Sequence, residues 1–281
     1  MYSVYACTHI KRYVNWGIYN MNLALIAITE DGIDVAKRIK EKLDGEVTIF
    51  LPQKLEQTML TATYYSRKFG DQVAELFSDY EGLIFIMASG IVVRTIAPHI
   101  TDKYTDPAVV VVDDVGRFVI SLLSGHEGGA NNLAHNVANI LHTDAVITTG
   151  TEAQKDIIIG IGCKRGIGSD EVKEAINSAL TEAEVSIDRV RLAGTVDLKA
   201  DEVGLLRALD ELGIPLRVVS RSEIDTCAKD YSKSDFVIEK IGVGGVAEPT
   251  ALISGRKTKL ILKRQIYPGI TVAIARENFS W

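Results

Sequence analysis

Residues 83–98 read LIFIMASGIVVRTIAP, a short passage that contains a strand, a turn and a helix in succession. The unbroken apolar run over 83–88 is typical of a strand that is buried on both faces of a sheet. Ser89 and Gly90 form the turn, and Pro98 helps to end the following helix because proline has no N–H to donate. A buried strand that leads directly into a helix indicates an α/β fold.

The same alternation continues along the whole chain. Before residue 150 it predicts strands at 23–28, 47–51, 109–113, 118–123 and 145–149, a turn at 114–116, and helices at 31–43, 71–80 and 132–141. After residue 156 it predicts strands at 157–161, 190–192 and 216–219, helices at 169–180, 201–212 and 247–254, and a terminal hairpin of 260–263 and 270–275. We therefore predict two α/β/α domains, each with a mainly parallel sheet covered by helices.

The domain boundaries follow from the same pattern. We place an N-terminal α/β domain at 21–152 and a C-terminal α/β domain at 156–281, with a short linker between them. Residues 1–20 are rich in tyrosine and carry no periodic pattern, whereas Met21 opens the first clean strand. Two interpretations of 1–20 stay open: a genuine N-terminal extension, or a stretch that precedes a native start at Met21.

Composition and charge argue against several functional classes. The net charge of −6 comes without a block of basic residues, which argues against a nucleic-acid partner, since phosphate binding needs clustered lysine and arginine. No apolar run is long enough to cross a bilayer and no signal peptide is recognisable, so we expect a cytoplasmic protein. Cys7, Cys163 and Cys227 lack CxxC spacing and fit neither a disulfide framework nor a zinc site.

The loop with the most specific chemistry is 121–131, SLLSGHEGGAN, which follows a predicted strand and leads into a helix. Its glycines allow close approach of the backbone to a ligand, and the helix start directs N–H groups there. His126 and Glu127 add an imidazole and a carboxylate. The candidate ligand-binding residues are Ser124, Gly125, Gly128, Gly129 and Asn131. An ordinary strand-to-helix turn is the other interpretation, and nucleotide binding is not supported because both phosphate-binding fingerprints are absent.

Two further loops contain glycine and follow predicted strands, where α/β sheets bind ligands. At 88–90, Ser89 and Gly90 precede Arg94, which is placed to hold a carboxylate or simply to lie on the surface. At 160–169 the sequence GIGCKRGIGS combines glycines with two cations that suit an anionic group. The candidate binding residues here are Gly162, Lys164 and Arg165, together with Gly244 from the glycine-rich turn 242–248.

Two residues near these loops have alternative interpretations. Cys163 lies beside Lys164 and Arg165, which would lower the pKa of its thiol, although a packing role is the more frequent one for a lone cysteine. Asp201 precedes a predicted helix and is expected to act as its N-cap.

Taken together, these segments resemble the cobalt-precorrin-5A hydrolase (CbiG) family. The similar stretches, in chain order, are 83–98, 103–113, 121–131, 146–149, 159–166, 197–202, 242–248 and 271–276. The resemblance covers essentially residues 21–276. It departs from the family at Lys164, where a second arginine is expected, at Gly245, where serine is usual, and in the nearly absent linker, where many members carry an extra segment.

The resemblance implies a hydrolase of anaerobic cobalamin (vitamin B12) biosynthesis. Such an enzyme opens the δ-lactone of cobalt-precorrin-5A and releases acetaldehyde to give cobalt-precorrin-5B. The substrate is a corrinoid that carries many carboxylates and brings its own cobalt, so we expect no cofactor and no protein metal site. The expected partners are this small molecule and other enzymes of the pathway, with neither nucleic acid nor membrane.

Lactone opening needs an activated water and donors for the developing oxyanion. We expect His126 or Glu127 to act as the base and the N–H groups of Gly128 and Gly129 to act as donors. The glycine loops are expected to converge, with Arg94, Lys164 and Arg165 holding peripheral carboxylates. A serine-esterase mechanism is not expected because the nucleophile-elbow motif is absent. Two alternatives stay open: a non-catalytic carrier of the corrinoid intermediate, and a different α/β enzyme that acts on a small anionic metabolite.

Overall fold

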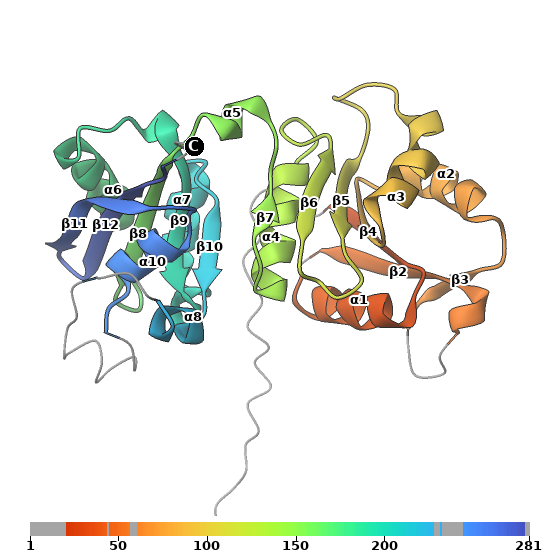
Figure 1. Ribbon diagram of the computed structural model, residues 1–281, viewed down its shortest axis with the longest axis horizontal. Helices are drawn as coiled ribbons and strands as arrows, with labels where there is room; N and C mark the ends of the chain where they lie inside the picture. Colours follow the sequence, from red (N-terminus) through yellow and green to blue (C-terminus); the bar gives the residue numbers. More distant parts are fainter. Residues whose placement is uncertain (1–20, 44, 57–60, 228–230, 232–243, 279–281) are drawn as a thin grey trace, which may run out of the picture.

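The computed structural model describes residues 21–43, 45–56, 61–227, 231 and 244–278, and the two interpretations of 1–20 lie outside these residues. The described strands form two sheets, one of seven strands and one of five. Figure 1 shows the two sheets on either side of helix α4, with the short helix α5 (Gly150–Ala153) in the connection between them. The prediction of two α/β units is confirmed.

The first sheet has the strand order β3-β2-β1-β4-β5-β6-β7. Its strands are β1 (Asn22–Ala27), β2 (Glu46–Pro52), β3 (Thr63–Tyr65), β4 (Gly82–Ile86), β5 (Ala108–Val112), β6 (Val119–Leu123) and β7 (Ala145–Val146). Neighbouring strands are parallel except β5 and β6, which are antiparallel. The central strands β4 and β5 are buried along their whole length, as their continuous apolar sequences predict.

Helices cover both faces of this sheet. They are α1 (Glu30–Lys42) and α4 (Ala130–Leu141) on one face and α2 (Phe69–Asp79) and α3 (Ser89–Ile96) on the other, with short 3-10 turns η1 (Gln53–Leu55) and η2 (Ala97–His99). Each face has its own apolar core, and the two cores share no buried residue. Thr29 is the N-cap of α1, and its hydroxyl accepts a hydrogen bond from the N–H of Gly32.

The second sheet has the order β10-β9-β8-β12-β11. Its strands are β8 (Ile157–Cys163), β9 (Val190–Val196), β10 (Leu216–Val219), β11 (Lys259–Tyr267) and β12 (Ile270–Arg276). The first three are mutually parallel, and β12 is antiparallel to both β8 and β11. The predicted terminal hairpin is therefore confirmed. Because it joins the sheet beside β8, the second sheet is mixed rather than mainly parallel.

The helices of the second unit also lie on both faces. On one face are α6 (Ser169–Glu182) and α7 (Val203–Glu211), and on the other are α10 (Ala247–Ile253) and the short α8 (Arg221–Asp225), with 3-10 turns η3 (Ile187–Arg189) and η4 (Asp197–Lys199). Helix α10 packs directly on the strand backbones. A Cβ atom at Gly160 would lie 1.8 Å from the carbonyl oxygen of Ala247, so this close packing requires glycine.

The side chain of Asn139 is one of the contacts that join the two units. Asn139 of α4 donates from Nδ2 to the carbonyl oxygen of Leu216 at 2.8 Å and accepts at Oδ1 from the N–H of Val218 at 2.9 Å. Both hydrogen bonds are buried, and both main-chain groups belong to β10, an edge strand of the second sheet. The carboxamide thus takes the place of a neighbouring strand and attaches the second sheet to α4.

Among the residues that the structure describes, no helix is both long enough and apolar enough to cross a membrane.

Candidate functional site

The loop 124–129 is held tightly at its base. Ser124 follows β6, is buried and has a positive φ of 56°, and a Cβ atom at Gly128 would lie 2.4 Å from its Cβ atom. Asn131, in the first turn of α4, accepts from the hydroxyl of Ser121 at 2.8 Å and donates to Thr149 Oγ1 at 3.3 Å. These contacts tie the loop to β6 and to the segment that leads to the second unit.

At the tip of the loop, His126 and Glu127 are both exposed. The Glu127 carboxylate accepts a hydrogen bond from Lys103 Nζ at 2.8 Å. This hydrogen bond is the largest cause of two pKa shifts: it lowers the pKa of Glu127 and raises the pKa of Lys103. Both groups are therefore charged at neutral pH. No described residue forms a hydrogen bond to the ring of His126.

Lys103 is a candidate site residue that the sequence did not identify. It belongs to the segment 101–106, which is closed by Asp106: this carboxylate accepts from the N–H of Thr101 at 3.1 Å and from its hydroxyl at 2.8 Å. The run 103–113 was part of the family resemblance, but nothing in the spacing connects Lys103 with a partner 24 residues later.

The loop also offers backbone donors. Gly129 is the N-cap of α4 and has a φ of 84°, and the next two N–H groups of the helix are used by Ser124 and Gly125 carbonyl oxygens. Within the described part of the chain, the N–H groups of Gly128 and Gly129 have no acceptor. The loop and its neighbour Lys103 therefore supply an imidazole, a carboxylate–ammonium pair and two N–H groups that have no acceptor among the described residues.

The expected convergence of the glycine loops is wrong. In the register of the first sheet, Leu123 of β6 pairs with Val109, whereas Ile86, the end of β4, pairs with Val112. The loop at 124–129 and the turn at 88–90 therefore lie at opposite ends of the strands, which are separated by roughly 10 Å along β5. The antiparallel direction of β6 is the physical reason.

Arg94 lies with the turn at 88–90, near the carboxyl end of β4. Its guanidinium folds back along α3 and donates to the carbonyl oxygen of Gly90 at 2.9 Å. Ser89, Gly90 and Arg94 thus form a separate group, away from His126 and Glu127.

The third group lies at the carboxyl end of β8. Arg165 donates to Asp201 Oδ1 at 2.6 Å and to the carbonyl oxygen of Leu198 at 2.7 Å, and Glu202 Oε2 lies 3.7 Å away. Arg165 is thus already bound by neighbouring acceptors. The prediction that Asp201 caps α7 is wrong, because the N-cap is Glu202 and the Asp201 carboxylate binds Arg165 instead.

The other predicted residues of this half lie close to the same end of β8. Lys164 Nζ is 4.0 Å from a Glu171 carboxylate oxygen, at the first turn of α6. A Cβ atom at Gly162 would lie 3.2 Å from Val246 Cβ, two residues after Gly244. β8 has seven residues and is therefore about 20 Å long. Its carboxyl end, where these residues lie, is separated by this length from the linker at its other end, which contacts the base of the 124–129 loop through Thr149.

Comparison with known proteins follows the same division into two halves. Residues 71–152 match the model of the cobalamin synthesis G N-terminal family (CbiG_N), and residues 157–275 match that of the cobalamin synthesis G C-terminus (CbiG_C). The chain belongs to the CbiG family. This assignment agrees with the resemblance seen in the separate sequence segments.

Relatives of the CbiG-family chain include two curated bacterial proteins. The chain is 26% identical over 352 residues to cobalt-precorrin-5A hydrolase of Priestia megaterium, covering 90% of the chain and 94% of that protein. It is 42% identical over 134 residues to cobalt-precorrin-5A hydrolase of Salmonella typhimurium, covering 48% of the chain and 37% of that protein. A solved cobalamin biosynthesis protein G homolog from Sulfolobus solfataricus has 20% identity and a TM-score of 0.37, covering 92% of the chain and 99% of the homolog.

In this CbiG-family chain, Cys163 does not have the lowered pKa that its basic neighbours suggested. Burial raises the pKa of the thiol to about 11, and this effect exceeds the opposite effects of Lys199 and Arg165. The thiol is therefore protonated at neutral pH, and a nucleophilic role is not supported by its surroundings.

We predict slow chemical modification of Cys163. In a Cys7→Ser, Cys227→Ser chain, the remaining thiol should react with a disulfide reagent at pH 7.5 about 100-fold more slowly than free cysteine, because only the thiolate reacts. The same chain unfolded in guanidinium is the control and should react at the rate of free cysteine. Equal rates before and after unfolding would contradict the prediction.

Proposed function

We propose that this chain is a cobalt-precorrin-5A hydrolase, which opens the δ-lactone of its corrinoid substrate and releases acetaldehyde to give cobalt-precorrin-5B. The observation that carries the proposal is the match of both halves to the CbiG models, together with a relative of that name in which 94% of the residues are covered. The loop 124–129 supports it by supplying the groups that lactone hydrolysis needs.

We assign the role of base to His126 rather than Glu127. The Glu127 carboxylate is engaged by Lys103, which makes it a weaker base, whereas no described residue occupies the ring of His126. His126 takes a proton from water as the water oxygen attacks the lactone carbonyl carbon. The carbon–oxygen bond of the lactone then breaks, and the proton passes to the departing alkoxide oxygen.

Two features of the loop stabilise the negative charge that develops on the carbonyl oxygen. The N–H groups of Gly128 and Gly129 have no acceptor among the described residues, and the Lys103 ammonium lies beside Glu127. In the second stage His126 accepts the proton of the newly formed hydroxyl. The carbon–carbon bond to the macrocycle breaks, its electron pair returns to the ring, and acetaldehyde leaves.

Carboxylate binding by Arg94, Lys164 and Arg165 becomes a narrower proposal. Arg94 and the pair at 164–165 lie in separate groups, and Arg165 already has a carboxylate partner. We propose that these three residues contact carboxylates of the macrocycle that are distant from the lactone. Lys103 is the cation that we place beside the lactone itself.

The test is turnover of cobalt-precorrin-5A under anaerobic conditions, with acetaldehyde and corrinoid mass as readouts. His126→Ala should lower kcat by about 100-fold or more, as expected for loss of a general base. Glu127→Gln should have a smaller effect, because it releases Lys103 without removing the base. His99→Gln is the matched control: this ring packs near Phe77 of α2, and the variant should keep normal turnover.

Each outcome decides between the candidate functions. Near-normal turnover in both His126→Ala and Glu127→Gln would eliminate the proposed catalytic groups. Tight binding of the corrinoid without acceleration over the uncatalysed reaction would indicate a carrier of the intermediate. Absence of both binding and turnover would reject the corrinoid substrate altogether.

A further inference from the structure

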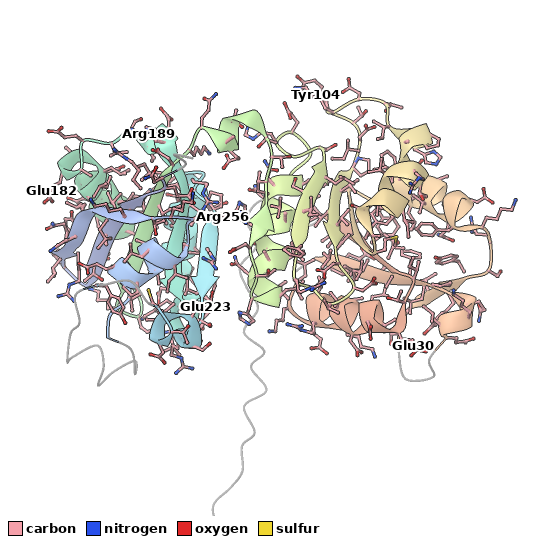
Figure 2. All side chains as sticks on the ribbon, viewed as in Figure 1. Glu30, Tyr104, Glu182, Arg189, Glu223 and Arg256 are labelled. Atoms are coloured by element: carbon pink, nitrogen blue, oxygen red, sulfur yellow. The ribbon has the colours of Figure 1, made fainter. Side chains whose placement is uncertain are left out.

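A cavity of about 460 Å³ lies between the two units. It is lined by α4, by the segment from β7 to α5, by β9 and β10, and by the turn that follows α10. Figure 2 labels Arg256 on the side of the second unit that faces α4. The described residues that line the cavity include none of those predicted as site residues, so it is a separate feature of the fold.

One cation that lines the cavity has no carboxylate partner among the residues that the structure describes. The cavity's other cations and their carboxylate partners are Lys155 with Glu152 at 2.6 Å, Arg191 with Glu277 at 2.9 Å, and Arg217 with Asp144 at 2.9 Å. The guanidinium of Arg256, by contrast, forms no ion pair with any described residue. Its backbone N–H is fixed by Glu277 Oε1 at 2.6 Å, which anchors the residue at the cavity.

A largely buried imidazole ring also lines this cavity. His135 of α4 is only 9% exposed and lines the cavity, yet no described residue forms a hydrogen bond to its ring. Burial lowers the pKa of His135 to about 4, with a smaller contribution from Arg191, so the ring is neutral and has one donor and one acceptor. A neutral ring that lines the cavity can donate one hydrogen bond and accept another, so it can bind a partner from outside the chain.

The rest of the wall is suited to a carbon skeleton. Ala138, Val146, Leu192 and Ile253 contribute apolar side chains to the cavity. Its volume falls within the range of small-molecule sites. A ligand of this site is therefore a small molecule or one arm of a larger one.

We propose that the cavity binds an organic carboxylate, with Arg256 pairing with the carboxylate group, His135 completing its hydrogen bonds and the apolar wall contacting its carbon chain. The carboxylate belongs either to a free small acid or to an arm of the corrinoid, and the second source rests on the proposed function. Because α4 and the second unit both line the cavity, the bound ligand would also hold the two units together.

The test uses the full chain with histidine labelled at Cε1 and follows His135 by NMR, its signal assigned with His135→Gln. The first probe is propionate, and its neutral isostere propionamide is the ligand control. Propionate should shift the His135 signal in a saturable manner, and propionamide should not. Arg256→Gln should weaken propionate binding by about tenfold or more, equal to the loss of a charged partner.

Arg207→Gln is the matched protein control, because this exposed arginine lies on α7, outside the cavity. Equal effects of the two arginine substitutions would overturn the assignment of Arg256. The second probe is cobalt-precorrin-5A: a shift with this probe alone would assign the site to a corrinoid arm, and a shift with neither probe would overturn the proposal.

The failure of this proposal is distinct from failure of the hydrolase. A chain that binds propionate at His135 but does not turn over the corrinoid keeps the cavity site and loses the enzyme. A chain that turns over the corrinoid with the same KM in Arg256→Gln, and shows no His135 shift, keeps the enzyme and loses the cavity site.

Discussion

Gly160→Ala is expected to lower the free energy of unfolding by about 3 kcal/mol or more. The added Cβ atom would lie 1.8 Å from the carbonyl oxygen of Ala247 and 2.7 Å from the N atom of Ala251. Both contacts are to backbone, so no side-chain rotation relieves them, and α10 must move away from β8. Urea unfolding followed by circular dichroism measures the change.

Gly70→Ala provides the control for this substitution. Gly70 is in the first turn of α2, and a Cβ atom there would meet nothing within 4 Å. The variant should be neutral or more stable by up to about 1 kcal/mol, because alanine favours the helix. A Gly160→Ala chain as stable as Gly70→Ala would contradict the close packing of α10 on the sheet.

Asn139→Leu is expected to cost about 2 to 5 kcal/mol and to uncouple the two units. The leucine side chain has nearly the size of the carboxamide but leaves the Leu216 carbonyl oxygen and the Val218 N–H buried without partners. The two units should then unfold in separate transitions, which differential scanning calorimetry resolves.

The control for Asn139→Leu lies on the same helix. Asn132 is exposed in the first turn of α4, and Asn132→Ala should change the free energy of unfolding by no more than about 0.5 kcal/mol. A single transition at the original temperature in the Asn139→Leu chain would show that the carboxamide does not join the units.

Much of the fold was predictable because apolar periodicity reports burial directly. The strand predicted at 216–219 has the observed bounds, and the terminal hairpin is present. The predictions fail for short elements: β3 has three residues and was not predicted, and β7 has two where five were expected. Elements of that length contain too few residues for a period to be recognised.

The placement of the 124–129 loop was predictable in principle. A turn of three residues at 114–116 can only join antiparallel strands, since a parallel connection needs a dozen residues or more. The strand at 118–123 must therefore run opposite to its neighbour and deliver the loop to the other edge of the sheet. The prediction that the glycine loops converge was wrong because it assumed that every strand-to-helix loop lies at the same end of the sheet.

The ionic pairs of the site were not predictable. Lys103 meets Glu127 across 24 residues, and Arg165 meets Asp201 across 36. Such pairs depend on how two loops fold toward each other, and no local period or spacing encodes that arrangement. The prediction of a lowered pKa for Cys163 was wrong for a related reason. Burial of the thiol, which the local sequence does not report, raises its pKa more than the cationic neighbours lower it.

The two edges of the second sheet are protected from uncontrolled strand pairing by different means. β11 carries exposed Lys259 and Lys263, charges that discourage another chain from adding a strand. β10 has the sequence LRVV, largely buried, and relies on the Asn139 carboxamide to occupy its open backbone groups. The first unit therefore covers an edge of the second sheet that could otherwise pair with a strand of another chain.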